Sequence, residues 1–367
     1  MSDIKLVGKF YDNHSLSIVN RNLAINMYKL LSNRVSIQAI DSPRPEYKVG
    51  NDTIKTLLSL ESSKPAKIEV RHSYPIIWGW PDQDSTKVVY IQPWEFSSIP
   101  SEWQYKFDTF ADAVITPSKW TADVYKNAGI NPKKVFTIPN GYNPDIFFNS
   151  NSKPSIPTFL FVGCNQYRKG LDVLLRAWVA ASKNTGAKLI IKDTPKIYGK
   201  TNLQQDIISL QYKTKCGSII YDDSDKSEKE MAELYNSVNY IVHPYRGEGF
   251  GMHLQEAQAC GAIPIVSSGG PTDEFITTGA KINTGRQIVN MYDIFALKPG
   301  DSMSNMGQHK WVLEPDVNHL ATLLHNAIFN TLPVNNTTPP NNIWSEIAKQ
   351  YINVLLPISD KNPERAR

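Results

Sequence analysis

The residues best suited to chemistry in this sequence stand on either side of a glycine-rich turn. Glu248 and Glu256 are eight positions apart, with Gly249 and Gly251 between them and Gly247 just before Glu248. Carboxylates accept several hydrogen bonds at once, and glycines let a backbone approach a ligand closely. This stretch therefore predicts a ligand site with two acidic side chains.

Two regular elements have to position the turn. Residues 238–243 form an apolar run with the length of a buried strand, and residues 255–260 indicate a helix that stops at Gly261. Glu248 is then expected on a strand-to-helix loop and Glu256 about one turn into the helix. Both should face the cleft at the carboxyl end of a sheet, where open α/β folds bind ligands.

The start of that helix has a second implication. Its unpaired N–H groups and the positive end of its dipole suit a phosphate group. The alternative is a glycine-rich turn that only connects two elements. The acids, the glycines and the helix start all agree with a site, so we favour the site.

The rest of the chain alternates strands with helices, which predicts βαβ units and parallel sheets. Residues 149–157 are polar, contain two prolines and show no periodicity, so we place a hinge there between domains at 1–150 and 158–330. The predicted strands are residues 4–7, 35–39, 67–71, 87–91, 113–116, 135–138, 158–162, 188–192, 218–221, 240–243 and 263–266. The predicted helices are residues 16–31, 118–129, 170–183, 228–236, 252–259, 316–329 and 343–355.

Composition excludes several classes of function. The 367 residues are 41% hydrophobic and 20% charged, as in an ordinary globular protein, and the net charge is only +4. Basic residues are not concentrated on one element, so no nucleic-acid partner is expected. No apolar run has the length of a membrane span, and the first residues do not resemble a signal peptide. Cys164, Cys216 and Cys260 lack metal or disulfide spacing, so the cytoplasm is the expected compartment, with peripheral membrane contact left open.

The E-x7-E pattern of Glu248 and Glu256 resembles the signature of retaining glycosyltransferases of the GT-B fold, in glycosyltransferase family 4. The resemblance extends to residues 159–172 with Arg168-Lys169-Gly170, and to residues 112–118, 138–143 and 269–275. It implies two Rossmann-like domains that face each other across a cleft. It also implies that the last helix, residues 343–355, crosses back onto the first domain.

The resemblance also implies roles for individual residues. Arg168 and Lys169 would bind the diphosphate of a nucleotide sugar, although an arbitrary Arg-Lys pair is more often a solvated surface pair. Glu248 would lie beside the hydroxyls of the donor sugar, and Glu256 would accept hydrogen bonds from the ribose. The backbone N–H groups of the turn would add hydrogen-bond donors for the diphosphate, at Gly249, Phe250, Gly251 and Met252.

The first domain is harder to interpret. Many relatives carry a histidine after a mid-domain strand, where this chain has Gln92 followed by Glu95. Either that pair or His72, after the preceding strand, would contact the donor sugar or the acceptor; a structural role for His72 is equally consistent. Gly8 opens the first loop, which is expected to line the cleft, with His14 near its end.

Two further patterns leave alternatives open. Trp78, Trp80, Trp94 and Trp103 would form a sugar-stacking platform or pack in the core. Asp82-Gln83-Asp84 and Asp223-Ser224-Asp225 match the metal motif of the other glycosyltransferase fold, but such short patterns arise by chance. No metal and no cofactor are expected.

The resemblance thus implies a retaining enzyme that moves a hexose from a UDP- or GDP-sugar to a hydroxyl of a glycan, a lipid-linked glycan or another acceptor. Its expected partners are the nucleotide sugar and a carbohydrate or glycoconjugate. One alternative is an inactive GT-B protein that binds an active partner, although such proteins usually lose the phosphate-binding or acidic residues present here. A second is a sugar-nucleotide epimerase of the same fold, a class that lacks this combination of motifs.

Overall fold

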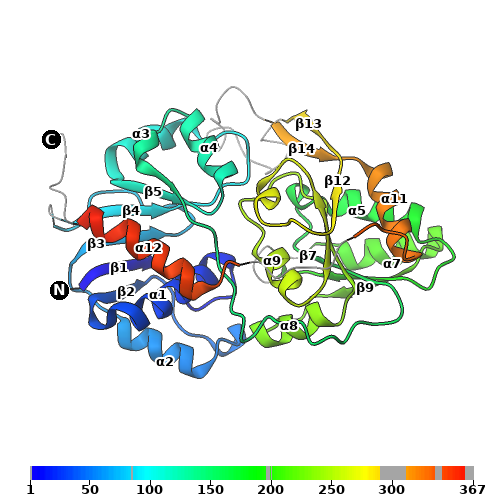
Figure 1. Cartoon of the computed structure of the whole chain (residues 1–367), viewed down its shortest axis with the longest axis horizontal. Helices are drawn as coiled ribbons and strands as arrows, with labels where there is room; N and C mark the ends of the chain where they lie inside the picture. The colour runs from blue at the N-terminus through cyan, green and yellow to red at the C-terminus, as the bar shows by residue number, and fades with distance from the viewer. Residues whose placement is uncertain are drawn as a thin grey trace.

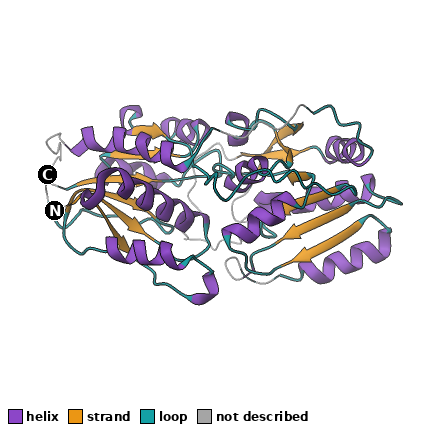
Figure 2. Ribbon diagram, turned by 60° about the horizontal axis from the view of Figure 1, so that its bottom comes forward, coloured by secondary structure: helices purple, strands orange, loops and turns teal. Residues whose placement is uncertain are grey.

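The computed structural model describes residues 2–83, 86–195, 199, 201–289, 311–334 and 341–359. Two α/β domains lie side by side, and the last helix returns to the first of them (Figure 1). Each domain is built on a parallel sheet of six strands that lies between helices (Figure 2).

The first sheet has the strand order β2-β1-β3-β4-β5-β6, all parallel. Helices cover both of its faces (Figure 2), so even charged strand residues such as Lys5 and Arg71 are buried. The strands are β1 (Ser2–Gly8), β2 (Val35–Ala39), β3 (Ala66–His72), β4 (Lys87–Ile91), β5 (Ala113–Thr116) and β6 (Val135–Thr137). The helices between them are α1 (Ser15–Leu31), α2 (Asn51–Leu60), α3 (Ser101–Phe110) and α4 (Lys119–Asn127).

The second sheet repeats this scheme with the order β12-β11-β10-β7-β8-β9, again parallel. The strands are β7 (Thr158–Val162), β8 (Lys188–Lys192), β9 (Ser218–Asp222), β10 (Tyr240–His243), β11 (Ile263–Ser267) and β12 (Ala280–Ile282). The helices are α5 (Leu171–Ala181), α7 (Leu203–Thr214), α8 (Glu228–Asn236), α9 (Met252–Ala259) and α11 (Val317–Ile328). An antiparallel pair, β13 (Thr284–Ile288) and β14 (Trp311–Pro315), lies outside the sheet.

The last helix, α12 (Trp344–Ser359), packs on α1, β1 and β3 of the first domain (Figure 1). Its apolar stripe of Trp344, Ile347, Tyr351 and Leu355 is buried there. The predicted return of the chain is confirmed, and the helix continues four residues beyond the predicted end at Leu355.

The two domains also touch directly beside the cleft. The N-terminus of α4 faces the second domain, and the backbone N–H groups of Lys119 and Trp120 donate to the carboxylate of Glu274 at 2.8 and 2.7 Å. The Ser118 hydroxyl donates to the Gly249 carbonyl at 3.0 Å, and the Thr121 hydroxyl contacts the same oxygen at 3.4 Å. The loop that carries Glu248 is therefore held by the first domain as well as by its own sheet.

Candidate functional site

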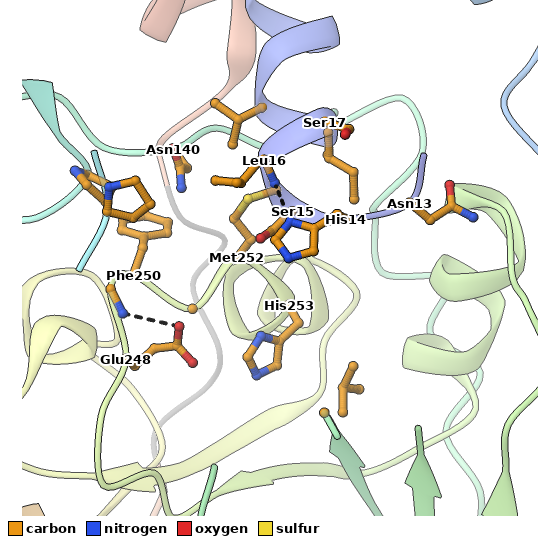
Figure 3. Close-up of a pocket in the computed structure, with 18 of the residues that line it drawn as sticks. Asn13, His14, Ser15, Leu16, Ser17, Asn140, Glu248, Phe250, Met252 and His253 are labelled. Atoms are coloured by element: carbon orange, nitrogen blue, oxygen red, sulfur yellow. Dashed lines mark hydrogen bonds between the residues drawn. The ribbon is translucent and has the colours of Figure 1, made fainter. Parts of the chain in front are cut away.

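A cavity of about 660 Å³ lies between the domains, at the carboxyl ends of β3 and β4 on one side and of β7, β8 and β10 on the other. Its volume is in the range that suits a small organic ligand. Figure 3 shows His14 of the first domain and Glu248 and His253 of the second around this space. The sequence-predicted residues that line it are His14, His72, Gln92, Glu95, Arg168, Lys169, Glu248, Gly249, Phe250, Gly251, Met252 and Glu256.

Gly8 is the one predicted site residue that does not line this cavity. It ends β1, and a Cβ built on it would lie 2.3 Å from the His72 carbonyl oxygen and 2.6 Å from Asn20 Nδ2. A side chain there would collide with the adjacent strand, so the structure gives Gly8 a packing role.

Glu248 is the centre of a buried charge cluster. Its Oε2 lies 2.5 Å from Lys169 Nζ, 3.2 Å from His243 Nε2 and 3.9 Å from Arg168 Nη1. Burial alone would raise the pKa of Glu248, but the charge of Lys169, the hydrogen bond with His243 and the charge of Arg168 hold it well below its usual range. Glu248 is thus ionised at neutral pH.

Glu256 has the opposite electrostatic setting. It lies in the second turn of α9, and its Oε2 accepts a hydrogen bond from the Tyr235 hydroxyl at 3.2 Å. Burial and the charge of Glu228 raise its pKa to about 8, against the opposing effects of Tyr235 and Arg21. A neutral carboxyl donates one hydrogen bond and accepts others, which suits a diol such as a ribose. The two acids of the motif therefore offer different chemistry in one cavity.

Arg168 and Lys169 end a short 3-10 helix, Tyr167–Lys169, just before α5. The next residue, Gly170, has a φ of 71°, and a Cβ there would lie 1.8 Å from the Pro244 carbonyl oxygen. This close approach lets the N–H groups of Arg246 and Gly247 donate to the Arg168 carbonyl at 2.7 and 3.2 Å. The loop with the basic pair and the loop with Glu248 are thereby joined through their backbones.

Arg246 also helps to hold these two loops together. Its guanidinium bonds both carboxylate oxygens of Asp172 at 2.7 and 2.9 Å and those of Glu314 at 2.7 and 3.1 Å. It also donates to the Tyr167 carbonyl and lies 3.9 Å from the centre of the Tyr167 ring. A buried cation with three partners fixes the start of α5, β14 and the basic loop relative to one another.

The first-domain residues meet this cluster from across the cavity. Glu95 lies 3.5 Å from the Arg168 guanidinium, so the domains share an ion pair. His14 caps α1 by accepting from Leu16 N–H at 3.2 Å, and Gln92 Nε2 donates to the Pro93 carbonyl at 3.1 Å. His72 is almost fully buried and contacts Asn20.

The tryptophans favour the core alternative. Trp94 and Trp103 are buried, although Trp94 also lines the cavity, and Trp78 packs edge-on against Phe107 with ring centres 4.9 Å apart. Trp80 is half exposed and packs on Phe110. At least three of the four rings therefore pack in the aromatic core of the first domain.

The structure describes only part of the two Asp-x-Asp motifs. Asp84 lies outside the described residues, and Asp225 lines the cavity. Within the described part of the chain, no three His, Cys, Asp or Glu side chains are grouped closely enough to hold a metal ion. In that same part, Cys164, Cys216 and Cys260 are free thiols, and no helix is long and apolar enough to cross a membrane.

Several site residues were missed from the sequence. His243 ends β10 and bonds Glu248, and His253 follows in α9 with its ring centre 4.4 Å from that of His243. Asn140 and Tyr235 line the cavity from the interdomain connection and from α8. His243 gave a local signal as a polar residue at the end of a buried strand, and Asn140 lies in the stretch 138–143 that carries the resemblance.

Two family models match the chain. The model described as Glycosyl transferases group 1 matches residues 143–293, and the model described as Glycosyltransferase Family 4 matches residues 61–146. The first match contains the basic pair and both acids of the cavity.

Curated relatives match over shorter shares of their length. An uncharacterised glycosyltransferase of Methanocaldococcus jannaschii is 26% identical over 259 residues, which are 70% of this chain and 64% of that protein. A D-inositol 3-phosphate glycosyltransferase of Catenulispora acidiphila is 26% identical over 153 residues, 38% of this chain and 36% of that protein. The matches thus cover less than two thirds of each relative.

Solved structures match over nearly the whole chain. A glycosyltransferase from Rickettsia africae has a TM-score of 0.61 at 14% identity, with 98% of this chain and 100% of that chain covered. Sucrose-phosphate synthase from Thermosynechococcus elongatus has a TM-score of 0.59 at 15% identity, with 96% and 98% covered. Anabaena HepE in complex with UDP-glucose has a TM-score of 0.57 at 13% identity, with 97% and 99% covered. At these identities the likeness shows the fold, two Rossmann-like domains in the GT-B arrangement.

Proposed function

We propose that this chain, which belongs to the GT4-type glycosyltransferases of the GT-B fold, transfers a hexose from a UDP- or GDP-sugar to a hydroxyl of a carbohydrate or glycoconjugate. The observation that carries the proposal is the convergence of Arg168, Lys169 and Glu248 with the start of α9 on one interdomain cavity. Cations and helix N–H groups suit a diphosphate, and a charged carboxylate suits sugar hydroxyls.

The charges of the cavity favour a donor that brings its own anion. Lys169 and Arg168 both lie against Glu248, and Arg168 also lies 3.5 Å from Glu95. A diphosphate placed beside these two cations would be bound by them, and its leaving charge would be stabilised as the sugar departs. HepE, a structural neighbour, is described in complex with UDP-glucose, which supports a donor of this class.

We propose further that the reaction retains the anomeric configuration. The bond from the sugar to the diphosphate breaks, a bond to the acceptor oxygen forms on the same face, and the acceptor proton passes to the leaving phosphate. The proposal rests on the family resemblance. The paired acids of glycosidases flank the scissile bond from opposite sides, whereas Glu248 and Glu256 belong to one loop and the helix that follows it.

Titration with nucleotide sugars tests the proposed function. At one hundred times its dissociation constant, the correct donor should stabilise the protein by about 2.7 kcal/mol, measured as a thermal shift. Slow hydrolysis of that donor without an acceptor would separate an active enzyme from an inactive partner protein, and release of an epimerised sugar would indicate an epimerase. Failure of every UDP- and GDP-sugar to shift the melting temperature would contradict the proposal.

The transfer is expected to be independent of metal ions. Arg168, Lys169 and the amides at the start of α9 supply the positive charge that a cation would otherwise supply. EDTA should therefore leave the turnover rate unchanged, measured by release of the nucleoside diphosphate. A loss of activity that Mn²⁺ or Mg²⁺ restores would contradict this and revive the Asp-x-Asp alternative.

The two acids of the motif are expected to fail differently. Glu256→Ala should weaken binding of the free nucleoside diphosphate by about tenfold, because that ligand carries the ribose that Glu256 would bind. Glu248→Ala should leave this affinity nearly unchanged and lower kcat and kcat/KM together, as expected for a contact made mainly in the transition state. Calorimetric titration of the nucleoside diphosphate into both variants measures these affinities. A larger loss of affinity in Glu248→Ala than in Glu256→Ala would show that the two carboxyls are assigned to the wrong ends of the donor.

A further inference from the structure

The starting observation is a fixed side-chain amide beneath the cavity. Asn20 is buried in α1, and its Nδ2 lies 2.9 Å from the Lys9 carbonyl oxygen and 3.1 Å from the His72 carbonyl oxygen. Carbonyls only accept, so both hydrogens of the Asn20 amide are used and its Oδ1 faces the other way. That oxygen lies 2.8 Å from His72 Nδ1. His72 Nδ1 therefore carries a hydrogen and donates it to Asn20.

The other ring nitrogen follows from the charge state. Burial, with a smaller effect of His14, lowers the pKa of His72 to about 3, so the imidazole is neutral at physiological pH. A neutral imidazole has one N–H group, and in His72 this is at Nδ1. Nε2 is consequently a lone-pair acceptor. It is buried, it has no hydrogen-bond partner within the described residues, and the side chain lines the interdomain cavity.

A buried acceptor without a partner costs about 1–3 kcal/mol, so a ligand that supplies a hydrogen there gains affinity. The diphosphate cannot do so, because ionised phosphate oxygens are acceptors too. The donors of a UDP- or GDP-sugar are the N–H groups of the base, the ribose hydroxyls and the hexose hydroxyls. The ribose is assigned to Glu256 in the second domain, whereas the hexose is the part expected to contact the first domain. We propose that His72 Nε2 accepts a hydrogen bond from a hydroxyl of a hexose in the cavity. The inference rests on the proposed function and assigns a contact that Arg168, Lys169 and Glu248 do not make.

Two substitutions separate the two nitrogens of the ring. His72→Asn places an amide near Nδ1, keeps a donor for Asn20 and removes the acceptor. His72→Gln places its amide near Nε2, keeps an acceptor and loses the Asn20 contact. If Nε2 binds a sugar hydroxyl, His72→Asn should lower kcat/KM on the order of tenfold, and His72→Gln should recover part of that loss. A purely structural role gives the reverse ranking, because the contact with Asn20 is then the one that matters. Affinity for the nucleoside diphosphate should be unchanged in both variants.

Nitrogen-15 NMR of histidine-labelled wild-type protein tests the same atom even if both variants fold poorly. Comparison with His72→Asn, or with the long-range couplings of each ring, assigns the His72 signals. In the free protein, Nε2 should have the shift of an unprotonated ring nitrogen. It should then move on addition of UDP-glucose or GDP-mannose but not of UDP or GDP alone. Movement only when glucose or mannose is added to the UDP- or GDP-bound protein would assign the hydroxyl to the acceptor side.

A protonated Nε2 in the free protein would overturn the inference. The inference would also fail if the Nε2 chemical shift did not change with any sugar or nucleotide sugar although UDP or GDP binds. This result would leave the proposed function intact. If neither the nucleotides nor their sugars bind, the proposed function fails and this inference fails with it.

Discussion

Lys169→Ala is expected to lower the rate of transfer by about 10²–10³-fold, the effect of removing one donor that stabilises a developing anion. Lys169 Nζ lies 2.5 Å from Glu248 and lines the cavity, so its charge serves both the carboxylate and the proposed diphosphate. Its loss also leaves Glu248 with a weaker counter-charge, which raises the pKa of that acid. Arg168→Ala should have an effect of the same order, because Arg168 supplies the second cation of the cluster.

Single-turnover measurements with any donor that the wild type accepts would check this expectation. Lys55→Ala is a matched control, because Lys55 is a mostly exposed lysine of α2 whose only described ion pair is a surface contact with Asp52 at 3.7 Å. The control should keep full activity, and all three variants should melt cooperatively. Near wild-type turnover in both Lys169→Ala and Arg168→Ala would show that the diphosphate binds elsewhere.

Arg246→Leu should have the largest effect on stability. Removing one partner of a buried ion pair costs roughly 3–5 kcal/mol. Arg246 is almost completely buried, but Asp172 and Glu314 are partly exposed and regain some hydration when the arginine is lost. We therefore expect a loss near 3 kcal/mol in the free energy of unfolding, the lower end of that range.

Arg176→Leu provides the matched comparison. Arg176 bonds the same Asp172 at 3.2 Å, but from an exposed position one turn along α5. A surface pair of this kind contributes only about 0.3–0.5 kcal/mol. Urea unfolding of the two variants should therefore show a large shift of the midpoint for Arg246→Leu and a small one for Arg176→Leu. Equal midpoints would mean that burial adds nothing to this ion-pair network.

Most strands of the two sheets could be predicted because they are short apolar runs, but β12 at the edge of the second sheet and the pair β13 and β14 were missed. Val88, Val89, Tyr90 and Ile91 form a continuous apolar run, and the predicted bounds of β4 are those observed. Three helices were missed, α2, α3 and α7. Each buries only two side chains, as does the predicted α8, but α8 begins with a capping box of Ser227 and Glu230 that the other three lack. In α3 the two buried side chains are Trp103 and Phe107, a single pair four positions apart, which gives too little periodicity to indicate a helix.

The candidate site likewise has features that could be predicted from the sequence and features that could not. Arg168, Lys169, Glu248 and Glu256 were predicted because each lies in a local motif, and the structure brings them to one cavity. The tautomer of His72 depends on Asn20, a residue 52 positions earlier in the chain. The raised pKa of Glu256 depends on its burial and on Glu228. Such contacts are made by tertiary packing and leave no pattern in a short stretch of sequence.

The hydrogen bonds that cross the cleft beside Gly249 have a consequence for building hybrids of such enzymes. Donor specificity is an obvious trait to move between relatives by exchanging the second domain as a block. In this chain, however, the loop that carries Glu248 is shaped partly by Ser118 and Thr121, which the first domain would keep. Glu274, which caps α4, would leave with the second domain. In a functional hybrid, the residues on both sides of these interdomain contacts must therefore come from the same parent enzyme.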